Sequence, residues 1–258
     1  MKTYVSLSFD DARQDSYRAI KIANSYGLKA TLNVTSSYVD STCPEDCLPC
    51  NLPAMSIDQV LELASQGNEI ACHGHYHNNQ IDSILEGEKI VRNWLRLDPA
   101  QKLGFASPHS GISLDEQTVS LMRDRFSYLR IGPSEKTVGL IKRGIRKTAL
   151  FTKSKHLFGL AFKNSVNLRD NFILKSVPIL NGNTVEQVQS LIHHTPSQNQ
   201  LIILMFHSVL SNDEQGSQDI FSWPLERFKE LCWKLANDFD VRVQRTIDWK
   251  RKDDYEEP

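Results

Sequence analysis

Apolar runs rich in β-branched and aromatic residues alternate along the chain with segments of helical periodicity. The apolar runs predict strands at residues 3–9, 30–36, 68–72, 102–107, 128–132, 172–180, 201–207 and 241–245. Apolar residues that recur every three or four positions predict helices at residues 12–26, 56–66, 79–97, 113–124, 183–194 and 224–238. Side-chain oxygens of Ser56, and of Asn183 or Thr184, can cap the starts of two helices. Strands that alternate with helices need crossover connections, so the pattern predicts a mostly parallel sheet.

The length of 258 residues, with 40% hydrophobic residues, fits one large domain better than two small ones. We expect a single domain at residues 1–250, followed by a polar tail at residues 251–258. The N-terminal "MKTYVSLSFDDA" reaches two carboxylates before a signal-peptide core could form, and five cysteines cannot all pair within one chain. These features predict a cytoplasmic protein in a reducing compartment.

Polar side chains stand at the ends of four predicted strands. Asp10 and Asp11 end the first strand, His73 follows "NEIAC", Ser107-Pro108-His109 ends "KLGFAS", and His207 ends "LIILMFH". In parallel α/β folds the carboxyl ends of the strands meet at one edge of the sheet, where chemistry gathers. We therefore expect these residues to share one site.

The segment "ACHGHYHNN" has histidines at 73, 75 and 77. If the chain turns into a helix there, His73 and His77 share a face and can converge on one metal ion, while His75 points elsewhere. Adjacent carboxylates at a buried strand end repel each other unless a cation or a proton separates their roles. One metal-bound carboxylate beside one free carboxylate, Asp11 and Asp10 in either order, resolves that conflict.

Three motifs resemble those of the polysaccharide deacetylase family, carbohydrate esterase family 4. "LSFDDA" is similar to its Thr/Ser-Phe-Asp-Asp motif, and "EIACHGHYHNN" to its His-x-x-x-His motif. "ILMFHSV" is similar to its late Leu-x-x-His motif, and "WPLERFKELCWKLAND" resembles its closing helix. The resemblance implies an α/β fold, an irregular (β/α) barrel of about seven parallel strands, and hydrolysis of N-acetyl groups on amino sugars with a divalent metal, usually Zn²⁺.

The resemblance also implies roles for individual residues. Asp11, His73 and His77 match the metal ligands, Asp10 matches the general base, and His207 matches the general acid that protonates the leaving amine. An amide is unreactive and its nitrogen leaves poorly, so a Lewis acid, an activated water and a proton donor together make coherent chemistry. Pro108 and His109 match the substrate and oxyanion region, to which the His109 backbone N–H can contribute.

The sequence departs from the family pattern at several positions. Ala106 stands where the family usually has an arginine that orients the base, and His109 stands at an aromatic position. Gly74 replaces the usual Ser or Thr of the histidine loop. No Asp-Trp motif that would tune the acid occurs at the expected place, because Asp248-Trp249 comes too late in the chain. Losses of this kind typically lower metal affinity or rate about 10- to 100-fold, and they leave open a catalytically dead carbohydrate-binding barrel.

A second alternative comes from "CPEDCLPC". Cys43, Cys47 and Cys50 have the Cys-x-x-x-Cys-x-x-Cys spacing of radical S-adenosylmethionine enzymes, which are also barrels. The same thiols could hold a structural zinc or stay unliganded. Against an iron–sulfur cluster, the motif follows the second strand rather than the first, and it leaves the four strand-end motifs unexplained.

Charge is unevenly spread along the chain. The net charge of −1 argues against general nucleic-acid binding, yet residues 136–175 contain ten Lys or Arg against one acid. Leu, Ile and Phe are interleaved with these cations, a pattern typical of an interfacial helix or hairpin. We expect either a solvated loop or a peripheral contact at the inner face of the membrane, with an amino-sugar substrate carried on a phosphate or a lipid.

Overall fold

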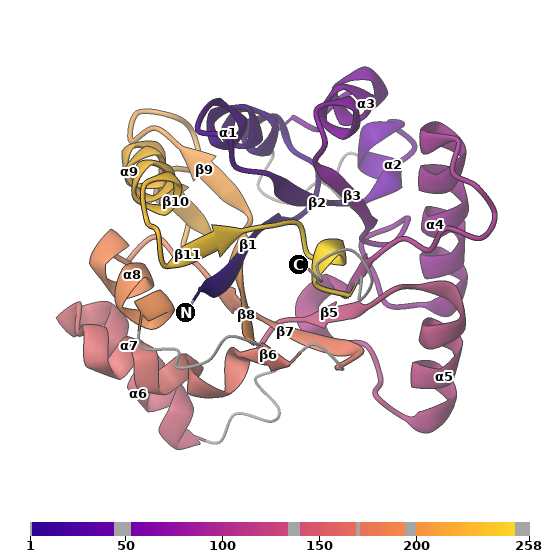
Figure 1. Ribbon diagram of the computed structural model, residues 1–258. Helices are drawn as coiled ribbons and strands as arrows, with labels where there is room; N and C mark the ends of the chain where they lie inside the picture. Colours follow the sequence, from indigo (N-terminus) through magenta and orange to yellow (C-terminus); the bar gives the residue numbers. More distant parts are fainter. Residues whose placement is uncertain (1, 44–52, 134–139, 169–170, 194–199, 251–258) are drawn as a thin grey trace, which may run out of the picture.

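A closed ring of parallel strands forms the centre of the computed structural model, which describes residues 2–43, 53–133, 140–168, 171–193 and 200–250 (Figure 1). Seven strands of the described residues close the ring: β1 (Thr3–Phe9), β2 (Ala30–Val34), β3 (Glu69–Cys72), β4 (Phe105–Ala106), β5 (Leu129–Ile131), β7 (Ile173–Pro178) and β8 (Gln200–Phe206). Each strand pairs in parallel with the next, and β8 pairs with β1. The predicted irregular barrel of about seven strands is confirmed.

Four short strands within the described residues lie outside the ring. β11 (Val241–Val243) extends the sheet parallel to β1, and β6 (Asn167–Leu168) pairs antiparallel with β8. β9 (Ser208–Leu210) and β10 (Ser222–Pro224) form a separate pair beyond the end of β8. Of these four, only β11 was predicted, within the apolar run at residues 241–245.

Helices surround the ring on its outer side (Figure 1). They are α1 (Gln14–Ser25), α2 (Ser36–Val39), α3 (Ile57–Ser65), α4 (Ile81–Leu95), α5 (Glu116–Arg125), α6 (Leu140–Thr152), α7 (Lys155–Phe162), α8 (Val185–His193) and α9 (Leu225–Ala236), with 3₁₀ turns at Pro108–Ser110, Lys163–Ser165 and Ile247–Lys250. The six predicted helices are all present. Ser56 forms a capping box with Gln59, and the Thr184 hydroxyl accepts a hydrogen bond from the Gln187 N–H, as their positions predict. Among the described helices, none combines the length and apolarity needed to cross a bilayer.

Successive side chains of β1 alternate between the outer face of the ring, which the helices cover, and its interior. Val5, Leu7 and Phe9 are fully buried and belong to the large core cluster between the ring and the helices. Ser6 and Ser8, which point the other way, are also fully buried, and they bond to polar groups inside the ring. The interior of the barrel is therefore partly polar, and this polar column continues up to Asp10 at the end of the strand.

The amino-terminal end of the barrel is filled by side chains. Trp249, on the last described turn, is fully buried in a small cluster with Tyr128 and apolar residues of β7 and β8. Glu69 beside it accepts hydrogen bonds from Thr31, Tyr128 and the Ile247 backbone N–H, at 2.7 to 2.9 Å. The polar strand-end residues singled out in the sequence lie at the other end. The predicted polar tail, residues 251–258, lies outside the described residues.

Candidate metal and catalytic site

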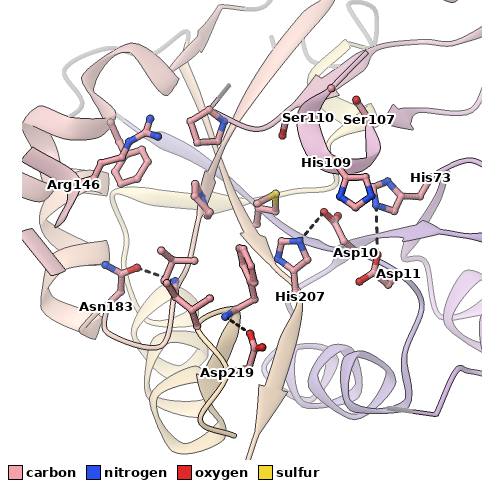
Figure 2. Close-up of a pocket in the computed structure, with 18 of the residues that line it drawn as sticks. Asp10, Asp11, His73, Ser107, His109, Ser110, Arg146, Asn183, His207 and Asp219 are labelled. Carbon is pink, nitrogen blue, oxygen red and sulfur yellow. Dashed lines mark hydrogen bonds and ion pairs between the residues drawn. The ribbon is translucent and has the colours of Figure 1, made fainter. Parts of the chain in front are cut away.

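The predicted strand-end residues meet at one end of the barrel. Asp10 and Asp11 follow β1, His73 follows β3, His109 follows β4 and His207 follows β8, and all five line one cavity of about 1350 Å³ (Figure 2). Parallel strands of similar length end at the same level, so the closed ring brings together residues almost 200 positions apart in the chain. The shared site expected from the sequence is present.

Asp11, His73 and His77 form a compact group of potential metal ligands. One ligand atom from each lies within 4.8 Å of the others. Asp11 Oδ1 is 3.1 Å from His77 Nε2 and 3.5 Å from His73 Nε2. This is the trio that the motif resemblance implies, and a carboxylate with two imidazoles is a donor set suited to zinc and similar divalent metals.

The histidines converge by a different route from the expected helical turn. Residues 75–78 form a series of bends, and α4 begins only at Ile81. Gly74 has a φ of 79° and His77 a φ of 51°, so two left-handed residues reverse the chain and return the second imidazole towards Asp11. His73 and His77 lie together as expected, but the helical reasoning for it is wrong.

Other residues steady this loop in place of the Ser or Thr that Gly74 replaces. The Ser83 hydroxyl accepts a hydrogen bond from the Tyr76 N–H at 3.0 Å, and its carbonyl accepts one from the His75 N–H at 2.8 Å. Gly87 on α4 lets the helix approach closely, because a Cβ there would lie 2.6 Å from the Gly74 carbonyl carbon. The loop is thus held against α4 by hydrogen bonds and by close packing.

A metal fits this group on two observations about its atoms. Asp11 Oδ1 is buried and has no hydrogen-bond partner among the described residues, although both imidazoles face it. His73 Nδ1 lies 2.8 Å from the Ala106 carbonyl oxygen, an arrangement that places the ring proton on Nδ1 and leaves Nε2 as a lone-pair donor. Such a carbonyl partner on the outer nitrogen is usual for metal-bound histidine.

The electrostatics of the trio suit a cation as well. Burial alone would raise the pKa of Asp11, but His73 and His77 outweigh it and hold that pKa well below its usual range. Burial lowers the pKa of His77, and the neighbouring Asp11 carboxylate more than reverses this and raises it. A carboxylate that draws a proton onto its neighbour is a centre where a divalent cation can replace that proton.

His75 lies apart from the trio. It is 6% exposed, and its Nδ1 lies 2.8 Å from the Ser36 hydroxyl oxygen. Its ring packs against Tyr76 with 4.1 Å between the ring centres. His75 is therefore packed against α2 and its neighbour, apart from the potential metal ligands.

Asp10 is held by an arginine that the sequence reasoning did not identify. Arg130 Nη2 donates to both carboxylate oxygens of Asp10, at 2.9 and 2.8 Å, and the Asn33 amide donates to one of them at 2.8 Å. Both charged residues are buried, at 2% and 1% exposure. Burial alone would raise the pKa of Asp10, but Arg130, with smaller contributions from His73 and His207, lowers it below the ordinary value. Asp10 is therefore a carboxylate at neutral pH, as a general base must be.

Arg130 stands beside the place where the family pattern has its arginine. On β4 and β5, Ala106 and Arg130 are register partners, so their side chains leave the sheet at the same level and on the same side. The guanidinium missing at position 106 is thus supplied from the neighbouring strand. A signal was available in "YLRIG", because an arginine between buried strand residues is almost always paired with an acid.

His207 lies beside Asp10 in the same cavity. Its Nε2 lies 3.9 Å from Asp10 Oδ2, and its ring packs against Phe221 at 4.9 Å. Burial lowers the pKa of His207, and the Asp10 and Asp11 carboxylates only partly offset the effect. Once protonated, His207 is therefore a stronger acid than an exposed histidine. Asp248 lies elsewhere, paired with Arg245 at 2.6 Å, so the late Asp-Trp pair takes no part in this site.

Pro108 and His109 lie on a 3₁₀ turn at the rim of the cavity. The Pro108 carbonyl accepts a hydrogen bond from the Asn79 amide at 2.7 Å. His109 has a φ of 51°, and its ring stands edge-on to His77 with 4.5 Å between ring centres. The imidazole of His109 is therefore next to the potential metal ligands, a placement that the sequence reasoning, which considered only its backbone N–H, did not foresee. The oxyanion role remains a prediction.

Backbone strain is concentrated around these residues. Of eight non-glycine residues with positive φ in the described part of the chain, five belong to this site: Asp11, Ala12, His77, His109 and Ser110. Left-handed conformations of this kind cost roughly 1–3 kcal/mol each and persist only where the surrounding structure enforces them. Their clustering marks the same end of the barrel as the ligand geometry does.

The cysteine alternative concerns a different loop. Cys43 is partly exposed and not in a disulfide, whereas Cys47 and Cys50 lie outside the described residues. The cluster hypothesis therefore stays an untested prediction. It gains no support from the strand-end residues, which form a site without it.

Comparisons with known proteins agree with this geometry. Residues 1–100 match the family profile described as "Polysaccharide deacetylase". No curated protein sequence matches the chain. The profile covers the part of the chain that contributes Asp10 and the three potential metal ligands.

Solved structures extend the similarity over almost the whole chain. Peptidoglycan deacetylase PdaC from Bacillus subtilis matches with a TM-score of 0.51 and 12% identity, over 96% of this chain and 90% of that one. A family 4 acetyl xylan esterase from Clostridium thermocellum in complex with a cobalt ion matches at 0.51 and 14%, over 95% and 89%. A mutant with restored enzymatic activity, of a carbohydrate esterase family 4 pseudoenzyme from Bacillus anthracis, matches at 0.51 and 11%, over 97% and 68%. At such identities these matches establish the fold alone, and the profile match shows that residues 1–100 are similar to the polysaccharide deacetylase family.

Proposed function

We propose that the protein is a metal-dependent amide hydrolase that removes an acyl group, acetyl in the first instance, from an amino sugar. The observation that carries this proposal is the joint presence, in one cavity, of the Asp11–His73–His77 trio and of the arginine-held Asp10 beside His207. A bound divalent metal, for which we propose zinc, would polarise the substrate carbonyl and lower the pKa of the attacking water.

The protein's own residues then move two protons. Asp10, kept ionised and oriented by Arg130, accepts a proton from the water as its oxygen attacks the carbonyl carbon. His207 donates a proton to the sugar nitrogen as the carbon–nitrogen bond breaks, so that a free amine and a carboxylic acid leave. The 3.9 Å between Asp10 Oδ2 and His207 Nε2 is short enough for one water to return the proton and reset both groups.

A binding barrel without activity is the competing function, since one solved relative is described as a pseudoenzyme. The main sequence argument for it is Ala106, and Arg130 removes that argument by supplying a guanidinium at the same level of the sheet. The predicted base, acid and ligand side chains are all present and face one cavity. We therefore favour an active enzyme.

Acetylated saccharides are the proposed substrates, by analogy with relatives described as a peptidoglycan deacetylase and an acetyl xylan esterase. The cavity of about 1350 Å³ has room for a saccharide, and apolar residues such as Phe221 and Met205 line it beside the polar ones. A cavity with both polar and apolar lining suits a sugar ring, which presents both an apolar surface and hydroxyl groups. A cytoplasmic location is part of the same proposal.

The test is release of acetate from N-acetylglucosamine oligosaccharides by protein loaded with Zn²⁺ or Co²⁺. Asp10→Asn and His207→Ala should keep the metal yet lose at least about 100-fold in kcat, because each removes one proton transfer. His193→Ala is the matched control, since this exposed histidine on α8 pairs with Asp238 and does not line the cavity. Full activity of either site variant would refute its assigned role. Absence of activity in the loaded wild type on every acylated amino sugar would favour the binding barrel.

A further inference from the structure

Arg13, two residues after the potential metal ligand Asp11, is a buried cation in the wall of the cavity. It lines that cavity and is 2% exposed. None of the motifs found in the sequence assigns it a role. A buried charge is costly unless opposite charges or hydrogen-bond acceptors surround it, so the groups around this guanidinium indicate what it does.

The backbone around Arg13 is held by the neighbouring chain. Asp11 has a left-handed φ of 76°, a conformation that persists only where the surrounding structure enforces it. The Ala12 carbonyl accepts a hydrogen bond from the Met55 N–H at 2.8 Å, and Arg13 forms an antiparallel bridge with Ala54. The side chain of Arg13 therefore starts from a fixed point next to Asp11.

One guanidinium nitrogen joins Asp11 to the segment that follows His207. Arg13 Nη2 lies 3.9 Å from Asp11 Oδ2 and donates a hydrogen bond to the Ser208 hydroxyl at 2.6 Å. Ser208 is 3% exposed and is the first residue of β9, which lies beside α1 (Figure 1). A buried hydrogen bond from a charged donor is among the stronger kinds, so it anchors the guanidinium in one orientation.

The two oxygens of the Asp11 carboxylate face different partners. Oδ1 lies 3.1 Å from His77 Nε2 and 3.5 Å from His73 Nε2, whereas Oδ2 faces Arg13. A separation of 3.9 Å is too long for a hydrogen bond, but charges attract each other strongly at this distance when both are buried. The guanidinium therefore opposes rotation of the carboxylate and keeps Oδ1 directed at the imidazoles.

Asp15 reduces the electrostatic cost of a cation beside a metal site. Its Oδ1 lies 3.9 Å from Arg13 Nε, and its Oδ2 accepts a hydrogen bond from the Val209 N–H at 2.8 Å. An uncompensated cation would repel a divalent metal and so lower the affinity of the site for it. The Asp15 carboxylate offsets part of that repulsion, because opposite charges close together partly cancel each other's field.

We propose that Arg13, anchored by Ser208 and balanced by Asp15, is a positioning residue that orients the proposed metal ligand Asp11. This inference rests on the proposed function, because it concerns the metal that the proposed hydrolysis needs. The anchor residue directly follows His207 in the chain, so one guanidinium also links the metal ligands to the proposed acid. Groups that orient a metal ligand in this way typically contribute about 10- to 100-fold to metal affinity.

A charge-neutral double variant separates orientation from electrostatic repulsion. Arg13→Met/Asp15→Asn removes the cation and the carboxylate together, and asparagine can still accept the Val209 N–H. We expect the affinity for Co²⁺, measured by competition with a chelator, to fall at least about tenfold. The visible spectrum of the bound Co²⁺ should change as well, because it reports the geometry of the ligands. Wild-type affinity and spectrum in this variant would overturn the proposal.

A second ion pair on α1 provides the matched control. Arg18 pairs with Glu214 at 2.7 Å and donates a hydrogen bond to the Val209 carbonyl at 3.1 Å, and neither Arg18 nor Glu214 lines the cavity. Arg18→Met/Glu214→Gln thus removes an arginine–carboxylate pair from the same helix without a change in net charge. It should keep the wild-type affinity and spectrum. Equal losses of affinity in the two double variants would show a general loss of stability and refute the assignment.

Smaller substitutions decide the question if the charge-neutral variant does not fold, which melting curves would reveal. Ser208→Ala removes the anchor and leaves both charges, and it should weaken Co²⁺ binding at least about threefold. Arg13→Lys keeps a cation beside Asp11 and should bind Co²⁺ more tightly than Arg13→Met does. Unchanged affinity in Ser208→Ala, or equal affinities in the two Arg13 variants, would overturn the proposal.

These titrations need no turnover, so the inference and the proposed function fail separately. A wild-type protein that binds Co²⁺ and loses it in the Arg13 variants, yet releases no acetate, would overturn the hydrolase and support the positioning role. A wild-type protein that releases acetate, with Arg13 variants of unchanged affinity and spectrum, would do the reverse.

Discussion

Replacement of Arg130 by methionine tests whether this residue performs the task of the arginine absent at position 106. Methionine fills a similar elongated volume without charge, so the change removes the two contacts of 2.8 and 2.9 Å to Asp10 with little loss of packing. Each hydrogen bond to a charged group is worth about 1.5–3 kcal/mol. Removal of one partner of a buried ion pair costs about 3–5 kcal/mol, because the remaining carboxylate stays buried and uncompensated. We expect the free energy of unfolding to fall by that amount in urea titrations at pH 7.

Activity should fall more steeply than stability alone would require. Without Arg130 the pKa of Asp10 rises, because burial is then opposed only by weaker contributions. The acidic limb of the kcat/KM profile should therefore move to higher pH, and a misplaced base should lower kcat by about 100-fold at the pH optimum. Arg130→Lys keeps the positive charge, so its kcat should lie between those of the wild type and of Arg130→Met.

Two further variants test whether the losses of stability and activity come from breaking the Arg130–Asp10 ion pair or from replacing Arg130 itself. Arg130→Met combined with Asp10→Asn should be less destabilised than Arg130→Met alone, because no charge is left unpaired. Ala106→Arg combined with Arg130→Ala moves the guanidinium one strand back and should recover part of the lost kcat. Additive effects of the two single substitutions on stability, or an Arg130→Met protein with wild-type kcat, would refute the reasoning.

Three other predictions follow from described contacts. His77→Ala should reduce bound metal to trace levels in elemental analysis, whereas His75→Ala should retain it, and the opposite pattern would show that the trio is wrong. Burial raises the folded-state pKa of Glu69 above its unfolded value of about 4.3. The folded state therefore binds the extra proton, and stability falls as the pH rises from the unfolded-state pKa through the folded-state pKa. Glu69→Gln should flatten the dependence of melting temperature on pH between pH 4 and 7, and an unchanged dependence would contradict the assignment. Gly87→Ala should lower the melting temperature and loosen metal binding, because its Cβ would overlap the Gly74 backbone, while Gly159→Ala on α7, with open space around it, serves as the control.

Sequence reasoning predicted the ring because buried strands give local signals, and the motif resemblance implied the group Asp11, His73 and His77, which the structure brings together. A buried strand such as residues 3–9 shows as a dense apolar run, and its carboxyl end is marked by the abrupt change to Asp10 and Asp11. Parallel topology then places every strand end at one level, so the chemistry could be located before any contact was known. Predicted strand and helix ends differ from the observed ones by a few residues where caps are weak.

What the sequence did not reveal are contacts between segments whose spacing carries no signal. Arg130 acts on Asp10 from 120 positions away, and only the register between β4 and β5 shows that it replaces an arginine at Ala106. Residues 136–175 had an amphipathic pattern but no indication of which side the cations would face. That direction depends on how α6 packs on α8, through a tertiary contact such as that between Gln187 and Ala149.

Closure of the ring has a consequence for the synthesis of the chain. β1 pairs along six residues with β8, from Tyr4 opposite Leu201 to Phe9 opposite Phe206. A ribosome therefore makes roughly 200 further residues after β1 before its partner exists, which takes on the order of 10 to 40 seconds at ordinary elongation rates. Throughout that interval one edge of β1 has no strand to bond to, and an open apolar edge is a site of aggregation. His207 directly follows β8 in the chain. Pairing of β8 with β1 therefore covers the open edge of β1 and brings the proposed acid next to the proposed base in the same step. Conditions that slow translation of the last third of the chain should lower the yield of folded protein.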